Sequence, residues 1–293
     1  MKLTTKRISI EDYPILLNEI SSPPPHMDFA GRFPDKKDKY LCVVGSRHNS
    51  VYGEDVTRKL IAGLKGYPIT IVSGLAVGID SIAHEAALEN GLNTICFPGS
   101  GLSLSVLYPA VKRDLALRIV ESGGALYSQF GMNQLGDKWT FPNRNRTMAG
   151  ASHATLIIEA AEKSGSLITT SHAREFGREV FAVPGSIISD LSYGPHSLIR
   201  DGATPVYSAE DILQGLGFQV IRTDGMISAL PNYSEMKLEP DQRTIIDHLR
   251  IEKLSSTGLI DKTGFTATKL NLVISELELL GLVKDANGIY RLM

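Results

Sequence analysis

The chain has 293 residues, of which 43% are hydrophobic and 21% are charged. This is the composition of an ordinary folded globular protein, and the length allows one large or two modest domains. The formal net charge of −2 excludes a strong overall attraction to nucleic acid, so any phosphate-binding site has to be a local patch.

Cysteine usage and hydropathy predict a cytoplasmic protein. Cys42 and Cys96 both lie in apolar runs typical of buried strands, which favours free thiols in a reducing compartment over a disulfide. Cysteine and histidine do not occur with the spacing of a zinc site, and we expect neither a metal nor another cofactor. The N-terminal stretch MKLTTKRISIEDYP lacks a long apolar core, so we expect no signal peptide and no membrane contact.

Residues 1–38 are predicted to be a short N-terminal extension. They contain an amphipathic pattern over about 10–19, which predicts a helix, and then the run Pro23-Pro24-Pro25, which interrupts regular structure. The extension is too short to form a domain of its own.

From Tyr40 onward, continuous apolar runs alternate with helical patterns. Such runs, each ending in Gly or Pro and followed by a helix, predict parallel strands that are covered on both faces. We therefore predict an extended Rossmann-like, doubly wound α/β domain with a mostly parallel sheet over residues 39–214. The expected strands are 40–45, 69–74, 93–99, 125–130, 154–160 and 180–185, and the expected helices are 50–64, 79–89, 110–121 and 167–176.

The pattern is lost over residues 215–236, which we interpret as a linker. Residues 237–293 are predicted to form a small winged-helix-like domain with helices over 239–250, about 256–262 and 266–280. A hairpin with Asn287-Gly288 at its turn is expected to follow.

The stretch KWTFPNRNRTMAG, residues 138–150, combines cations, aromatic residues and carboxamides without an acidic side chain. Pro142 predicts an extended conformation at Phe141, and Asn143 is predicted to cap a short helix through Ala149. Cations at a helix start beside an aromatic ring suit phosphates with a base stacked next to them. The alternative is an exposed loop with solvated cations and an aromatic residue that fills the core.

Four glycine-containing loops follow predicted strands and are expected to meet at one edge of the sheet. They are Gly45-Ser46-Arg47, the stretch 73–80, the stretch 98–101, and Ser164-Gly165-Ser166. None has the GxGxxG spacing of a dinucleotide site. Together with residues 138–146 they predict a phosphate-binding groove that is long enough for more than one nucleotide. The candidate contacts are Gly45, Ser46, Arg47, Ser73, Gly74, Gly78, Lys138, Phe141, Asn143, Arg144, Asn145, Arg146, Gly165 and Ser166.

Catalytic signatures are weak. Asp80, His84 and Glu85 lie on one predicted helix, where a carboxylate beside a histidine is compatible with an acid–base pair. A structural role for this group is the stronger interpretation, because the sequence has no nucleophile elbow, Walker loop or HExxH motif. We expect a binding protein without enzymatic activity.

Several motifs stand in order along the chain: GSR at 45–47, SGLAVGID at 73–80, YP at 108–109, FPNRNR at 141–146, GSLIT at 165–169 and VPG at 183–185. In this order they resemble the DNA-processing protein A family (DprA, also called Smf) of bacterial natural transformation. The resemblance covers residues 40–213 and extends to the C-terminal module.

The resemblance implies a competence protein that binds and protects single-stranded DNA and loads the RecA recombinase onto it, with no enzymatic activity. It also implies a homodimer formed through the Rossmann-like domain. On the matching positions, Arg47 and Lys138 would hold DNA phosphates, Phe141 would stack on a base, and the glycine loops would supply backbone N–H groups.

Two other hypotheses remain open. One is a Rossmann-like nucleotide hydrolase that uses the same glycine loops. The other is a transcription regulator whose winged helix binds duplex DNA. Residues 237–293 contain eight Lys/Arg and eight Asp/Glu, so their charge favours a protein contact or weak DNA binding over operator recognition.

Overall fold

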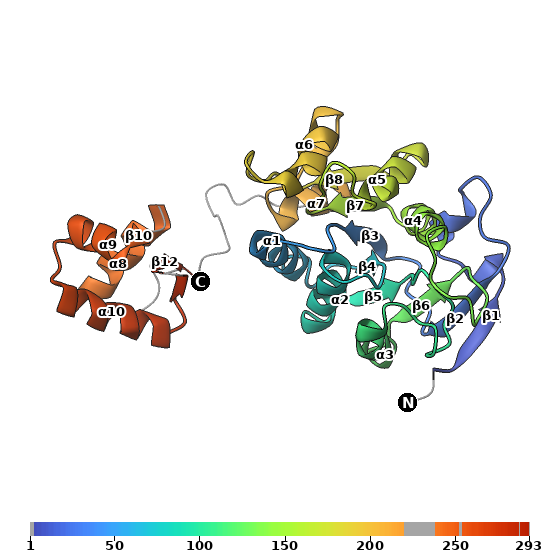
Figure 1. Cartoon of the computed structure of the whole chain (residues 1–293), viewed down its shortest axis with the longest axis horizontal. Coiled ribbons are helices and arrows are strands. Elements are labelled where there is room, and N and C mark those ends of the chain that lie inside the picture. The colour runs from blue at the N-terminus through green and yellow to red at the C-terminus, as the bar shows by residue number, and fades with distance from the viewer. Residues whose placement is uncertain (1–2, 220–237, 252–253, 287, 293) are drawn as a thin grey trace. The chain divides into compact units, whose positions relative to one another are not determined.

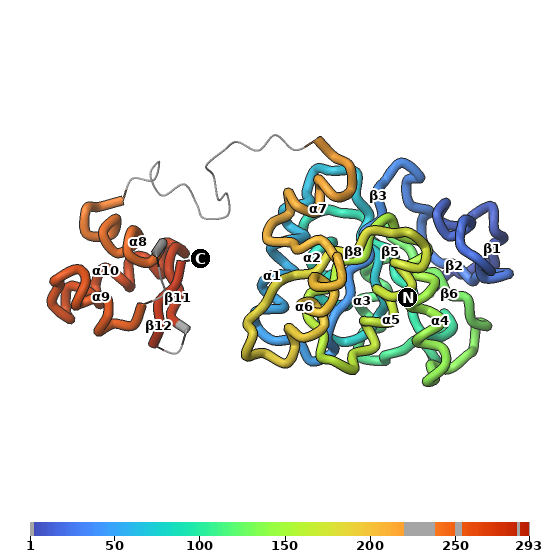
Figure 2. The backbone as a smooth tube through the Cα atoms, turned by 90° about the horizontal axis from the view of Figure 1, so that it is seen from above, coloured from blue at the N-terminus to red at the C-terminus, as the bar shows by residue number. Residues whose placement is uncertain are grey.

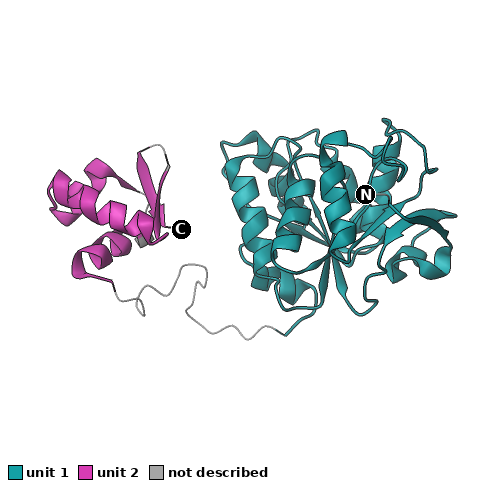
Figure 3. Cartoon of the chain, turned by 90° about the horizontal axis from the view of Figure 1, so that it is seen from below, with its two compact units in different colours: residues 1–220 teal, residues 221–293 magenta. Residues whose placement is uncertain are grey.

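A computed structural model describes residues 3–219, 238–251, 254–286 and 288–292 of the chain. The chain divides into two compact units, residues 1–220 and 221–293 (Figure 3). The first unit contains the predicted α/β domain, and the second contains the predicted C-terminal module.

The first unit is built on a nine-stranded, mostly parallel sheet with the order β1-β2-β6-β5-β4-β3-β7-β8-β9 (Figures 1 and 2). The pairs β1–β2 and β2–β6 are antiparallel, and all other neighbours are parallel. The predicted Rossmann-like α/β class is confirmed. The strands are Thr5–Ile8 (β1), Met27–Gly31 (β2), Lys39–Val44 (β3), Ile69–Ser73 (β4), Asn93–Cys96 (β5), Ala125–Ser128 (β6), Ala154–Ile157 (β7), Glu179–Ala182 (β8) and Thr204–Pro205 (β9).

Helices cover both faces of this sheet. Along β3, Tyr40, Cys42 and Val44 belong to one apolar cluster, and Leu41 and Val43 belong to the cluster on the opposite face. This alternation explains the unbroken apolar run, because both faces are buried. The helices are Val51–Ala62 (α1), Ile79–Glu89 (α2), Arg113–Glu121 (α3), Thr140–Gly150 (α4), Ser166–Glu175 (α5), Tyr193–Arg200 (α6) and Ala209–Gly215 (α7).

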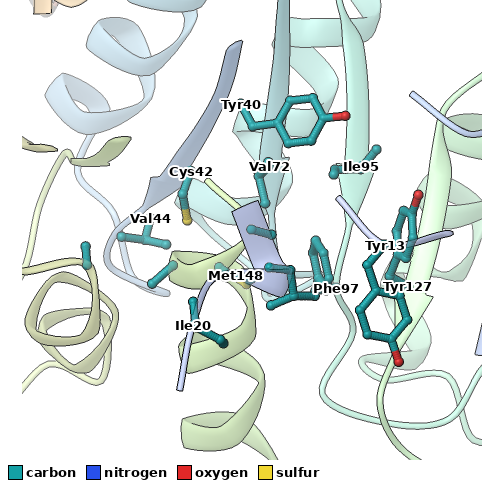
Figure 4. Packing of buried hydrophobic residues seen from close by; sticks show 14 of the residues in the cluster. Tyr13, Ile20, Tyr40, Cys42, Val44, Val72, Ile95, Phe97, Tyr127 and Met148 are labelled. Carbon is teal, nitrogen blue, oxygen red and sulfur yellow. The ribbon is translucent and has the colours of Figure 1, made fainter. Parts of the chain in front are cut away.

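Helices α4, α5 and α6 contribute to the cluster that contains Tyr40, whereas α1, α2 and α7 pack on the other face. The first cluster also includes residues from the N-terminal segment, among them Tyr13 and Ile20, together with Phe97 and Met148 (Figure 4). The N-terminal segment therefore takes part in the main core.

The helix predicted over about 10–19 does not form as one element. Two short 3-10 helices, Ile10–Asp12 and Ile15–Asn18, stand there on either side of Tyr13 and Pro14. Tyr13 is extended, with φ −75° and ψ 157°, because a residue that precedes proline is pushed away from the helical region. Strands β1 and β2 then join the N-terminal extension to the main sheet, because β1 pairs with β2 and β2 pairs with β6.

Helix α4 starts earlier than predicted. It begins at Thr140, so Phe141 and Pro142 are helical and Asn143 is not its cap. Proline is tolerated there because the first N–H groups of a helix have no partner within the helix. The Thr140 hydroxyl donates to the Gly99 carbonyl at 2.6 Å, which fixes the start of α4 to the segment that follows β5.

The first unit continues beyond α7 into the predicted linker. Leu216 is buried, and Phe218 packs edge-on against Tyr67 with 5.5 Å between the ring centroids. The rest of the predicted linker, residues 220–236, lies outside the described residues.

The second unit contains helices Pro240–Ile251 (α8), Ser256–Thr263 (α9) and Ala267–Leu279 (α10). Its sheet has the order β10-β12-β11, formed by Leu254–Ser255, Ile289–Leu292 and Val283–Ala286. Ser255 and Thr266 cap α9 and α10 through their side chains. The three predicted helices and the hairpin are present, although Asn287 at the turn is not described; the winged-helix assignment stays a prediction.

Among the helices in the described part of the chain, none is both long and apolar enough to cross a membrane.

Candidate nucleic-acid interface

A groove of about 600 Å³ opens where the chain leaves β3 and β7. These strands are neighbours, but the chain continues from β3 to α1 on one face of the sheet and from β7 to α5 on the other. Such a switch point is where doubly wound sheets bind ligands. The lining residues are Val44, Gly45, Ser46, Arg47, His48, Ala76, Asp80, Lys138, Phe141, Pro142, Arg144, Asn145, Ala161, Lys163, Ser164, Gly165, Ser166, Ile168 and Thr169.

Three exposed cations line this groove. Arg47 comes from the β3–α1 loop, Lys138 from the segment before α4, and Lys163 from the β7–α5 loop. Within the described ranges, none of the three side chains forms an ion pair or a hydrogen bond. Their charges are thus available to an anion that enters the groove.

Phe141 forms a wall of the groove and is half-buried. The Arg47 guanidinium lies 5.2 Å from its ring centroid, and the Tyr108 ring lies 5.7 Å away on the side of a smaller pocket of about 80 Å³. Gly99 permits this packing, because a Cβ at that position would lie 2.5 Å from the Phe141 ring. An aromatic ring beside free cations is suited to base stacking.

Arg144 is a buried structural cation instead of a free phosphate ligand. It is 5% exposed, donates to the Phe97 carbonyl and the Asn145 side chain at 2.9 Å each, and lies 3.9 Å from the Asp80 carboxylate. Burial raises the pKa of Asp80, and the Arg144 charge counteracts this. The pair joins α4 to the start of α2 beneath the groove.

Several of the predicted glycines serve close packing. A Cβ at Gly45 would lie 2.6 Å from Ile79, and one at Gly74 would lie 1.7 Å from the Arg144 guanidinium. Gly78 has φ +83° and a Cβ there would lie 2.3 Å from the Ser46 carbonyl oxygen, which accepts from the Ile79 N–H at 3.1 Å. The loops after β3 and β4 are therefore held together through backbone contacts.

The structure brings nine of the fourteen predicted contact residues to the groove and leaves five outside its lining. Ser73 is buried and donates to the Val43 carbonyl at 2.7 Å, and Asn143 donates to the Trp139 carbonyl at 2.9 Å. Arg146 donates to the carbonyls of Ser21 and Ser22. Gly74 and Gly78 are not among the lining residues, so we remove all five from the set of candidate contacts.

Lys163 is the main groove-lining residue that was not predicted from the sequence. It directly precedes Ser164-Gly165-Ser166, and its place next to that loop was the available signal. Asn145 donates to the Gly165 carbonyl at 3.2 Å, which ties α4 to this loop, and both residues line the groove.

The group Asp80, His84 and Glu85 is dispersed. His84 is buried between the Gly74 carbonyl and the Thr94 hydroxyl, each 2.7 Å from a ring nitrogen, and burial lowers its pKa to about 4. Glu85 instead contacts Lys112 and Arg58. In the ranges that the structure describes, no cluster of three or more His, Cys, Asp or Glu side chains is arranged to hold a metal.

The start of α1 is already occupied by an anion of the protein. The Glu159 carboxylate accepts from the Ser50 N–H at 2.9 Å and from the Ser50 hydroxyl at 2.5 Å. A nucleotide phosphate at this helix terminus, the usual position in dinucleotide-binding proteins, would face that carboxylate. An anion in the groove would therefore be attracted to Arg47, Lys138 and Lys163 and not to this helix terminus.

Fold and groove together define a Rossmann-like α/β protein with a cation-lined groove at the switch point of its sheet. The family model described as DNA recombination-mediator protein A matches residues 5–217. The chain belongs to this family.

Known relatives show the same likeness. The chain is 38% identical over 259 residues to the protein Smf of Escherichia coli. The match covers 85% of this chain and 67% of that protein. The chain spans 63% of the Smf protein of Synechocystis. The structure of DNA processing protein A from Streptococcus pneumoniae matches with a TM-score of 0.68 at 40% identity, covering 74% of this chain and 75% of that chain.

A structure of DNA processing protein A from Helicobacter pylori matches with a TM-score of 0.64 at 25% identity. It was described for the single-stranded DNA binding mode of that protein. This match covers 74% of the present chain and 98% of the H. pylori chain.

Proposed function

We propose that this chain binds single-stranded DNA in the groove between β3 and β7. The observation that carries the proposal is the arrangement of three exposed cations, Arg47, Lys138 and Lys163, in a groove walled by the half-buried ring of Phe141; within the described residues none of the three forms an ion pair or a hydrogen bond. The single-stranded DNA binding mode named for the H. pylori relative supports the same ligand.

In this proposal the three cations contact successive phosphates, and Phe141 stacks on a base. Phosphates and the flat faces of bases occur in every nucleotide, so binding is tolerant of sequence. The net charge of the chain is −2, so attraction of DNA depends on these local cations.

We further propose that the protein is a mediator without turnover of its own. It would protect incoming single strands in the cytoplasm during natural transformation, act as a homodimer through the α/β unit, and help to load RecA. Membership of the recombination-mediator family supports this role. The Glu159 carboxylate at the start of α1 makes the alternative, a nucleotide hydrolase, less favourable.

The test is fluorescence anisotropy with labelled poly-dT and the equivalent duplex across a salt series. Arg47→Ala, Lys138→Ala and Lys163→Ala should each lower the slope of log affinity against log salt by about 0.7, the value for one phosphate of a single strand. Phe141→Ala should weaken binding by about 1–3 kcal/mol with an unchanged slope, because it removes stacking and no charge.

Lys65→Ala is the matched control. Lys65 is an exposed lysine in the loop between α1 and the start of β4, so it lies at the amino ends of the parallel strands, whereas the groove lies at their carboxyl ends. Its affinity and slope should equal those of the natural protein. Unchanged slopes in all three cation variants would remove the groove from the binding site. Hydrolysis of nucleoside monophosphates by the pure protein would instead support the enzyme hypothesis.

The mediator role requires a separate assay. RecA filament formation on single-stranded DNA coated with single-strand-binding protein should start sooner when this protein is added. The Arg47→Ala and Lys138→Ala variants should lose the effect in proportion to their loss of DNA affinity. Normal DNA binding without any effect on RecA would contradict the loading function and leave the groove assignment intact.

A further inference from the structure

The outward face of α10 in the C-terminal unit carries a stripe formed by Thr268, Leu272, Ser275 and Leu279. The opposite face packs inward through Leu270, Val273, Ile274 and Leu277. Leu272 is 62% and Leu279 is 89% exposed. At about 100° per residue, the stripe points directly away from the core of the unit.

The charges around this stripe do not suit a nucleic acid. Lys269 is the one cation of α10; its ammonium lies 2.8 Å from the Asp241 carboxylate and 4.2 Å from the centroid of the Phe265 ring. Glu276 and Glu278 flank the stripe. A phosphate backbone laid along this face would meet two carboxylates, and the single cation is balanced by Asp241, so the face carries no net positive charge.

The spacing of the stripe is that of a helix–helix seam. Its four residues are separated by four, three and four positions, which is the a/d pattern of paired helices. We propose that a second copy of this chain covers the stripe, with the two α10 helices antiparallel.

An antiparallel register fits the side chains of the seam. It places Leu272 opposite the partner's Ser275 and Leu279 opposite the partner's Thr268, so that a large residue meets a small one at every level. A parallel register would instead stack serine on serine in the middle of the seam.

Charge complementarity favours the same register. In an antiparallel pair, Lys269, which already contacts Asp241 of its own unit, lies beside the partner's Glu276 on the same flank of the seam. Glu276 accepts one hydrogen bond, from the Gln242 side chain at 2.9 Å, and as a carboxylate it can accept more. In a parallel pair, Lys269 faces the partner's Gly264, which precedes the helix and offers no carboxylate. The unequal distribution of charge along α10 thus selects the antiparallel arrangement.

The contact is short. A helix of 13 residues is about 20 Å long, so the seam by itself is a small interface. Covalent trapping is therefore a better probe than elution volume, and it also reports which residues meet.

The experiment uses two full-length variants, Leu272→Cys and Ser275→Cys, one of them carrying a mass tag. The natural cysteines, Cys42 and Cys96, are fully buried and do not compete. Under mild oxidation the mixture should form the mixed disulfide several-fold faster than either variant crosslinks with itself, because only unlike positions face each other in the antiparallel seam. Both substitutions are at exposed positions, so the fold should be retained, and circular dichroism checks this.

Lys284→Cys, an exposed position on β11, is the matched control for random collisions. Adding Leu279→Glu to the Leu272→Cys chain should suppress the mixed disulfide. A mixture that crosslinks no faster than the control overturns the proposal, as does equal crosslinking of each variant with itself. Protection of the new thiol from maleimide by duplex DNA, without crosslinking, would assign the face to DNA instead.

Discussion

Arg144 and Arg146 are two residues apart in the sequence, yet they meet opposite surroundings. Arg144 is buried against Asp80 and the end of β5, whereas Arg146 extends to the N-terminal segment. Residues two positions apart in a helix are separated by about 200° around its axis, so these two side chains leave α4 on opposite sides. The free cations of the groove come from the loops on either side.

Gly74 controls whether Arg144 fits. We expect Gly74→Ala to lower the free energy of unfolding by roughly 3–5 kcal/mol, because a Cβ 1.7 Å from the guanidinium displaces Arg144 and leaves Asp80 buried without its partner. Urea unfolding followed by circular dichroism measures this. Gly131→Ala is the control, since a Cβ there meets open space, and its midpoint should hardly change. A Gly74→Ala protein as stable as the control would contradict the assigned packing.

At the scale of elements, α4 is the part of the fold that sets the groove. Phe141, Arg144 and Asn145 lie toward the groove. The other side of α4 packs on the N-terminal segment around the 3-10 helix Ile15–Asn18, where Ile20 approaches Gly150. Arg146 fastens that side through the carbonyls of Ser21 and Ser22 and lies 5.2 Å from the Phe176 ring centroid.

Arg146→Ala should therefore behave as a structural variant. We expect it to lower the free energy of unfolding by about 1–3 kcal/mol, because hydrogen bonds from a charged donor are lost. The salt slope of DNA binding should stay that of the natural protein, since Arg146 does not line the groove. Urea midpoints and the anisotropy salt series provide both quantities. A slope lowered by about 0.7 would return Arg146 to the phosphate contacts.

At the scale of the whole molecule, two histidines make stability depend on pH. Burial lowers the pKa of His84 and that of His153 to about 4 each, and the His153 Nδ1 accepts from the Tyr40 N–H at 2.9 Å. Between about pH 6.5 and pH 4 the unfolded chain binds protons at these sites that the folded chain does not, so stability falls as the pH falls through this window. The raised pKa of Asp80 acts in the opposite sense.

A comparison of variants isolates the histidine contribution. For His84, a folded pKa of about 4 corresponds to a loss of about 2 kcal/mol between pH 7 and pH 5. We expect the difference in free energy of unfolding between these two pH values to be smaller by that amount in His84→Gln. Urea titrations at both pH values measure it; an equal difference in the variant and the natural protein would show that His84 titrates normally.

The sequence alone determined the alternation of strands and helices, the edge of the sheet where the loops meet, and the family. These follow from local information, because a run such as 40–45 shows burial on both faces and a glycine after a strand marks a loop. The place of Arg47, Lys138 and Phe141 in the groove lining could be predicted for the same reason, since each stands in or next to such a loop.

Only the tertiary structure decided the N-terminal strands and the roles of individual polar residues. Strand β2 pairs with β6, about a hundred residues further along the chain, so no local pattern predicted it. Arg144, Arg146 and Gly74 carry the right chemistry for a phosphate site, but their distant partners determine what they bind. Local periodicity reports that a residue is buried or exposed, whereas the choice of partner depends on which segments the fold brings together.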